Sequence, residues 1–267
     1  MIPDVPAPWP RPRYVSAGPA TFAYVVLLPE PIELSRPDHP LFESIVLETK
    51  TRSDDPDWFK GWTDPKTSFG SQLLRTPGID IVGAQGAQAA MIVRGVVEDP
   101  KSLGHLQRSF LLLKLLTGAG AVAACDVEAL VWWTREQLED LPDDWEFDVA
   151  DHIRIVFESQ ETEPGAGHLC HTLGMAKFGR PDLAIGGIER EHASAAGEML
   201  ENLATALAEG DNFETDDIVE PDGFPPLRCE EVEDDSGTPE TIFGNRSLWL
   251  IPEEGAAEAP PEGEAQG

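Results

Sequence analysis

Basic residues are scarce in this 267-residue sequence: 19 lysines and arginines stand against 49 aspartates and glutamates, a formal net charge of −30. This deficit argues against nucleic-acid and anionic-membrane partners, because both are polyanions that an acidic protein repels. Cysteine is scarce as well, with only Cys125, Cys170 and Cys229. Three scattered cysteines cannot build a disulfide framework, so we expect free thiols in a reducing compartment.

Long apolar runs are also missing. No stretch approaches the roughly 20 apolar residues that a membrane-spanning helix needs. Residues 1–6 show no basic flank, apolar segment or cleavage site of a secretory signal. We therefore expect a cytoplasmic protein without a membrane partner. Hydrophobic residues still make up 41% of the chain, enough for one large core or two small ones.

The two ends of the chain differ in composition from its middle. Residues 1–19 carry six prolines and predict an irregular arm. Residues 208–267 hold 18 acids and two bases, so over half of the net charge lies there. The last part, residues 252–267, consists mostly of Pro, Glu, Ala and Gly and predicts a disordered acidic tail. A single domain is expected over residues 20–251.

Hydrophobic spacing in the first half of this domain predicts strands, one clear helix and a loop. A helix is expected from Leu103, with apolar residues at helical spacing, Ser102 as the cap and Gly118 as the stop. Residues 51–78 are rich in Asp, Pro, Gly and Ser and predict a long loop. Residues 134–137 fit a capping box that starts a brief helix. Strands are predicted over residues 22–28, 79–82 and 90–97 (the last two as a hairpin), 121–124 and 129–133.

A polar hinge near residues 143–148 precedes a second set of elements in a similar order. Strands are predicted over residues 152–158, 168–177, 185–188 and 248–251. A helix is predicted over residues 192–208, with Gly210 as its stop. Its apolar face is expected to comprise Ala195, Met199, Leu203, Ala206 and Leu207. The pattern predicts an α+β fold of antiparallel sheet with two main helices on one face, in two tandem strand-strand-helix-strand halves.

The segment from His168 to His171 contains residue types that bind soft metals or act as nucleophiles. On a strand, His168 and Cys170 share one face while His171 points away, so at most two local ligands converge. Further ligands would have to come from Cys125, Cys229 or His152, whose spacing is not that of a metal site. We favour a strand whose cysteine packs in the core, and we expect no metal or cofactor.

Phosphate-loop and catalytic motifs are not evident either. The glycines at 118 and 120 follow a helix and precede a strand, the reverse of a phosphate loop. Gly83 and Gly86 lack the accompanying Lys and Ser or Thr. We find no nucleophile elbow and no zinc-protease helix. Residues 230–235 are mostly acidic but lack calcium-loop spacing, so a solvated loop is favoured. No catalytic residue is assigned, and the balance leans against an enzyme.

Two kinds of residue are candidates for partner binding. Tryptophan is common at interfaces, and Trp58, Trp62 and Trp133 lie in a polar loop or next to a helix cap. One of the adjacent pair Trp132 and Trp133 is expected to face out, although a structural role for both clusters is the simpler reading. The acidic candidates are Glu230, Glu231, Glu233 and Asp234.

The stretch from His171 to Ile185 carries Thr172, then Gly174 and Met175, then Phe178 and Gly179, followed by an acidic and apolar segment. This pattern resembles a family of uncharacterised bacterial proteins, the domain of unknown function numbered four-two-six-one. The resemblance covers about residues 103–251 and implies an α+β fold in a bacterial cytoplasm, with no reaction or ligand. Independently, Gly174 and Gly179 permit a bulge or tight turn, with Phe178 filling the core between them.

Two main functions remain open from the sequence, beside a third in which the carboxylate-rich C-terminal end mimics a nucleic-acid backbone and occupies a basic protein. The first is a protein-interaction module without enzymatic activity, similar to an immunity factor or an inhibitor, that binds a basic protein. The second is an enzyme or small-ligand-binding protein with a pocket near residues 168–179. A deep pocket with convergent polar groups favours the second, and a flat acidic face with exposed tryptophans favours the first.

Overall fold

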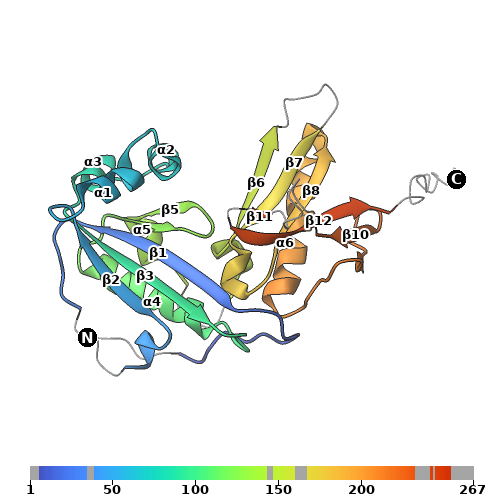
Figure 1. Ribbon diagram of the computed structural model, residues 1–267, viewed down its shortest axis with the longest axis horizontal. Helices are drawn as coiled ribbons and strands as arrows, with labels where there is room; N and C mark the ends of the chain where they lie inside the picture. The colour runs from blue at the N-terminus through green and yellow to red at the C-terminus, as the bar shows by residue number, and fades with distance from the viewer. Residues whose placement is uncertain are drawn as a thin grey trace, which may run out of the picture.

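The computed structural model describes residues 6–34, 39–142, 147–159, 167–231, 241–242 and 244–253. Two β-sheets, each with one long helix, form the arms of a V that is joined at its base (Figure 1). This confirms the predicted α+β fold. Within the described ranges, no helix is long and apolar enough to cross a membrane.

The first half is a five-stranded antiparallel sheet in the order β2-β3-β1-β4-β5. Its strands are β1 (Ala20–Leu28), β2 (Val46–Thr51), β3 (Ala89–Val97), β4 (Ala123–Asp126) and β5 (Val131–Thr134). The central strand β1 carries apolar side chains on both faces, and each face is covered by helices. Tyr24 and Val26 belong to the core that includes the long helix α4, and Val25 and Leu27 belong to a separate cluster beneath three short helices.

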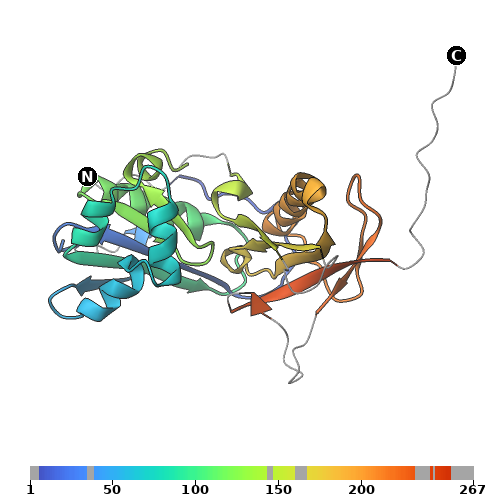
Figure 2. The ribbon, with the colours of Figure 1, turned by 90° about the horizontal axis from the view of Figure 1, so that it is seen from above.

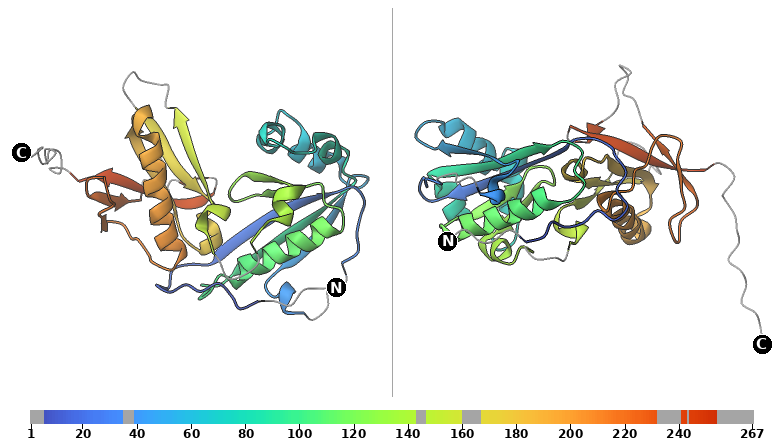
Figure 3. Two further views of the ribbon diagram at one scale, coloured as in Figure 1. Left: turned by 180° about the vertical axis from the view of Figure 1, so that it is seen from behind. Right: turned by 90° about the horizontal axis from the view of Figure 1, so that it is seen from below.

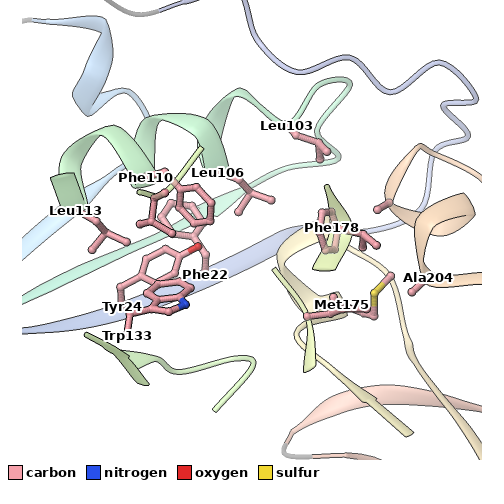
Figure 4. Packing of buried hydrophobic residues seen from close by; sticks show 14 of the residues in the cluster. Phe22, Tyr24, Leu103, Leu106, Phe110, Leu113, Trp133, Met175, Phe178 and Ala204 are labelled. Carbon is pink, nitrogen blue, oxygen red and sulfur yellow. The ribbon is translucent and has the colours of Figure 1, made fainter. Parts of the chain in front are cut away.

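The helix α4 (Gly104–Gly118) is where the sequence places it, although its N-cap is Leu103 without a side-chain hydrogen bond. Figure 4 shows Phe110 and Leu113 packed over the sheet beside Tyr24 and Trp133. The rings of Phe110 and Trp133 meet edge to face with centroids 5.9 Å apart. The capping box at Thr134 and Gln137 is confirmed and starts α5 (Arg135–Glu139).

Between β2 and β3, the predicted loop and hairpin are wrong. The chain forms α1 (Pro56–Thr63), α2 (Ser68–Arg75) and α3 (Ile81–Gly86), which lie across one end of the first sheet (Figure 1). Each helix starts at a side-chain cap, provided by Asp55, Thr67 and Asp80. The Oδ1 atom of Asp80 accepts a hydrogen bond from the Gly83 amide at 2.9 Å. This cap stabilises a helix where the sequence predicted a strand.

The second half has a sheet in the order β6-β7-β8-β12-β10-β9, with β11 beside β12. Its strands are β6 (Arg154–Ser159), β7 (His168–Leu173), β8 (Asp182–Ile188), β9 (Ile218–Val219), β10 (Leu227–Glu230), β11 (Thr241–Ile242) and β12 (Asn245–Pro252). β8 and β12 are parallel, whereas the other pairs are antiparallel. Three strands precede the long helix in each half, one more than predicted, and only the first half has α1, α2 and α3 between its second and third strands. The two sheets also differ in strand order.

The helix α6 (Ala193–Ala208) lies along this second sheet (Figure 3) and contacts β7 and β8. Its predicted apolar face is wrong by part of a turn. The buried residues are Ala196, Met199, Leu200, Ala204, Leu207 and Ala208, and Ala195 is exposed. A helix so rich in alanine has weakly polar sides, so the sheet rather than the sequence pattern decides which side is buried.

The proline-rich arm is irregular and runs along the junction of the two halves (Figure 2). Trp9 is only 1% exposed and packs against Phe110 and Phe147, at centroid distances of 6.1 and 5.6 Å. The Arg11 guanidinium donates to the carbonyls of Pro100 (2.9 Å) and Ala208 (3.0 Å). The arm therefore ties the segment before α4 to the end of α6.

Candidate functional site

The predicted aromatic candidates lie inside the first half. Trp58 and Trp62 are half-buried on α1, and their rings lie 5.5 Å apart. Trp62 also stacks near Phe69 of α2, at 4.3 Å. Trp133 is 8% exposed and stacks on Tyr24. Trp132 is 2% exposed because α2 covers this face. Neither of the adjacent pair faces solvent, contrary to the expectation.

The predicted acidic candidates that the structure describes are already paired with arginines. Glu230 lies 2.5 Å from the guanidinium of Arg228, and Glu231 lies 3.2 Å from that of Arg246. Glu233 and Asp234 lie outside the described residues. Exposed pairs of this kind contribute little energy, but they leave Glu230 and Glu231 less available to a basic partner.

The histidines and cysteines singled out in the sequence do not converge. Cys125, Cys170 and Cys229 are buried free thiols. Burial raises the pKa of the Cys170 thiol to about 11, which disfavours a nucleophilic thiolate. Among the described residues, three potential metal ligands come together only at Glu189, Glu191 and His192, and all three are exposed. Surface acids of this kind carry no argument for a metal.

The polar groups that do converge lie at the junction of the halves, around a short turn after β7. Gly174 and Gly179 bracket the 3₁₀ helix η3 (Met175–Phe178), with φ of 109° and 66°. A Cβ on Gly174 would lie 2.7 Å from the His152 carbonyl oxygen, so only glycine fits. The tight turn predicted from these glycines is present. It ends the predicted strand at Leu173 and turns the chain toward the first half.

From this turn, Lys177 enters the core of the first half and forms a fully buried ion pair with Asp126 at the end of β4. The other oxygen of Asp126 accepts from the amides of Glu128 and Ala129, at 3.0 and 3.1 Å. His105 of α4 hydrogen-bonds the Lys177 carbonyl at 2.9 Å. A buried pair is unfavourable to form unless its remaining lone pairs are satisfied, and these contacts supply that condition.

Aromatic rings surround the same junction. His152 is 1% exposed and stacks on Phe110 with centroids 4.5 Å apart. Phe178 and Met175 lie opposite α4 across the junction (Figure 4). Burial, and then the charge of Lys177, lower the pKa of His152 well below its usual value. The imidazole therefore stays neutral and acts as a packing ring.

Arg180 fixes the far side of the turn to the arm. Its guanidinium donates to the carbonyls of Val15, Gly210 and Asp211 at 2.7 to 2.8 Å. Arg180 is 2% exposed, so its guanidinium binds backbone carbonyls and does not contact solvent. The turn, the arm and the end of α6 are therefore held as one unit.

Asp182 at the start of β8 organises the opposite side. Its Oδ1 accepts from the Thr172 hydroxyl at 2.9 Å and the Met175 amide at 3.3 Å. Its Oδ2 accepts from the Asn245 side-chain amide at 2.7 Å. Burial raises the pKa of Asp182 to about 6, although these hydrogen bonds oppose the shift.

Beside Asp182 lies a cavity of about 240 Å³ between the two halves. One wall comes from the β4–β5 turn and α2, and the other from η3, β8 and β12. It is lined by Phe69, Val127, Glu128, Leu130, Gly174, Ala176, Asp182 and Asn245. Burial, and then the neighbouring Asp126, raise the pKa of Glu128. The Glu128 carboxyl, which ionises at a higher pH than a free glutamate, therefore lines the cavity together with Asp182.

A larger hollow of about 750 Å³ adjoins this cavity and shares Ala176 and Asn245 with it. Its walls are residues 16–19 of the arm, the chain around Arg180, and the start of β12. The two spaces place polar groups from both halves around one junction. This arrangement lies within and beside residues 168–179, where the sequence allowed a pocket.

Sequence reasoning missed the residues that build this site, namely Asp126, Glu128, Lys177, Asp182 and Asn245. A signal was present for some of them. Lys177 and Asp182 lie inside the stretch between His171 and Ile185, and Asp126 and Glu128 follow a short apolar strand. An acidic residue at the end of a buried strand is a candidate site residue, because the loops that follow strands often carry functional residues.

No family model matches the chain, and the searches of curated proteins and of solved structures also find no match. The resemblance to the bacterial family described above therefore stays a prediction.

Proposed function

We propose that this chain is a binding module that holds a positively charged partner, a basic segment of another protein, at the junction between its two halves. The observation that carries the proposal is the cavity beside Asp182, because Glu128 and Asp182 face it from opposite halves. Carboxyls gathered in a concave, partly desolvated site favour a cationic group over an anionic or neutral one.

Shape and charge support a basic segment rather than an isolated contact. The cavity opens beside a hollow of about 750 Å³, so a chain that inserts one group can lie along the adjoining surface. The net charge of −30 also raises the local concentration of basic partners by long-range attraction. The interaction-module hypothesis from the sequence is thereby retained, but its site moves from the tryptophans to the junction.

A second function is favoured by the larger hollow alone. Its volume lies within the roughly 300 to 1,000 Å³ that is typical of small-molecule sites. Its lining includes Asn212, Asn245 and Arg246, which offer hydrogen bonds to a polar ligand. A small polar molecule held there is the alternative to a protein segment.

Selection of peptides from a random displayed library on the full chain tests the proposal. We expect enriched peptides to carry lysine or arginine, and to lose binding to an Ala176→Trp variant, because Ala176 borders both spaces and a large ring there obstructs the passage between them. A matched Ala150→Trp variant, changed at an exposed alanine in η2 (Val149–Asp151), should bind the peptides as the unaltered protein does. Peptides without basic residues, or equal binding to Ala176→Trp, would contradict the proposal.

A further inference from the structure

The junction cavity is small and has two kinds of wall. Its volume of about 240 Å³ is below the range of roughly 300 Å³ and more that is usual for small-molecule sites. Phe69, Val127 and Leu130 supply apolar surface. Glu128, Asp182 and Asn245 supply polar atoms. Apolar walls with a polar end suit an alkyl chain that carries one charged head group.

Within the part of the chain that the structure describes, the carboxyls in the cavity form no ion pair, although the charge of Lys177 partly offsets the rise that burial causes in the pKa of Glu128. Asp182 is 1% exposed, yet its hydrogen bonds come from a hydroxyl, an amide side chain and a backbone amide, all of them neutral. The carboxylate of Glu128 makes no hydrogen bond to the described residues, whereas the Glu128 backbone amide donates to Asp126. Asp182 is buried and Glu128 is half-buried, and a carboxylate that is wholly or partly removed from water without a counter-ion is unfavourable.

Two cations near the cavity form their hydrogen bonds and ion pair with groups other than its carboxyls. Lys177 is paired with Asp126. Arg154 donates to the Leu130 carbonyl and to the Gln72 side chain, both at 3.1 Å. Neither of these cations lines the cavity. A cation that fills the cavity therefore has to come from another molecule.

From these observations we infer that the cavity binds a single alkyl-guanidinium or alkyl-ammonium group, presented as an arginine or lysine side chain of the partner, with Glu128 as its counter-ion. The inference rests on the proposed function and names the group that its site recognises. The alkyl stem lies along Phe69 and Leu130. The head group lies between Glu128 and Asp182, where its single positive charge pairs with Glu128 and reduces the repulsion between the two carboxyls.

Calorimetric titration of the full chain tests this recognition with small probes. Butylguanidinium and butylammonium ions should bind, whereas butylurea, a neutral molecule of similar shape, should not. Glu128→Gln should weaken both cations by about tenfold or more, the loss expected when a charged hydrogen-bond partner is removed. Glu136→Gln, at an exposed glutamate on α5, should leave the affinities unchanged.

Equal binding of butylurea, no effect of Glu128→Gln, or no binding of either cation would overturn the inference. The acetylated and amidated tripeptide Gly-Arg-Gly should bind at least as tightly as butylguanidinium, and its failure would contradict the side-chain source. Should Glu128→Gln not fold, Ala176→Trp serves as a second variant, because it blocks the cavity without a change of charge. Peptide binding that is blocked by Ala176→Trp but unaffected by Glu128→Gln would leave the proposed function standing while this inference fails.

Discussion

Lys177 comes from the second half and meets its counter-ion, Asp126, in the first. Removing one member of a buried pair leaves an uncompensated charge, so Lys177→Met should lower the free energy of unfolding by about 3 to 5 kcal/mol. Adding Asp126→Asn should restore part of this loss, because the amide oxygen can still accept from the backbone while the charge is gone.

Urea unfolding of the single and double variants measures this coupling. As a control, Lys60→Met disrupts an exposed pair with Asp57, where little or no change in stability is expected. Additive losses in the double variant would show that the two side chains do not act as a pair.

Asp182 gives the junction a pH dependence whose sign follows from its environment. Burial raises the pKa of Asp182 to about 6 from its ordinary 3.8. The folded state therefore holds this proton more tightly than the unfolded state. The contribution of this group to stability is fully present below pH 3.8, the ordinary pKa of an aspartate in the unfolded chain. It is lost as the pH rises through the folded-state pKa of about 6.

The test compares the unaltered protein with Asp182→Asn by urea unfolding at several pH values from 4 to 7. The unaltered protein should lose stability relative to the variant as the pH rises through this window. The difference should become constant above the window. A difference that grows in the opposite direction would mean that hydrogen bonds to the charged form outweigh burial.

At the scale of elements, the turn between β7 and β8 sets the position of the site. Gly174 has φ of 109°, and a Cβ there would collide with a backbone carbonyl. Gly174→Ala should therefore destabilise the fold by more than about 1 kcal/mol. Gly61→Ala, on α1, is the matched control, because a Cβ there meets no atom within 4 Å. Thermal unfolding should show a lower midpoint for the first variant and an equal or higher midpoint for the second.

Elements with strong local signals could be predicted from the sequence. The apolar strand β1, the helix α4 and the capping box of α5 each depend on neighbouring residues and lie where expected. Three short helices were missed, because glycines and prolines between them resemble loop composition while their caps at Asp55, Thr67 and Asp80 are isolated single residues.

The site itself could not be predicted, since its partners are far apart along the chain. Lys177 and Asp126 are 51 residues apart, and Asp182 and Asn245 are 63 apart. Nothing in the local spacing of either pair indicates contact. One of Trp132 and Trp133 was expected to face out, but both are buried, Trp132 beneath α2. This burial depends on tertiary packing rather than on strand alternation.

At the scale of the whole molecule, the net charge of −30 should govern how fast a basic partner arrives. Exposed charges are screened over about 8 Å at physiological ionic strength, so added salt should slow association with a basic peptide. Dissociation should change less, because it depends on contacts already made in the junction. Surface-immobilised binding at several salt concentrations separates the two rates. If the association rate does not vary with salt, the negative charge does not steer the partner and serves solubility only.

Mapping where a small cation binds tests the proposed junction site most directly. Two-dimensional amide NMR of the isotopically labelled chain, titrated with butylguanidinium, reports which residues respond. We expect the largest shifts at residues 127–130, at residues 174–176 and at Asn245, which come from both halves and surround the cavity. Saturable shifts confined to these segments would support a cation site at the junction. Shifts spread over the acidic surface without saturation, or centred on α1, would contradict it.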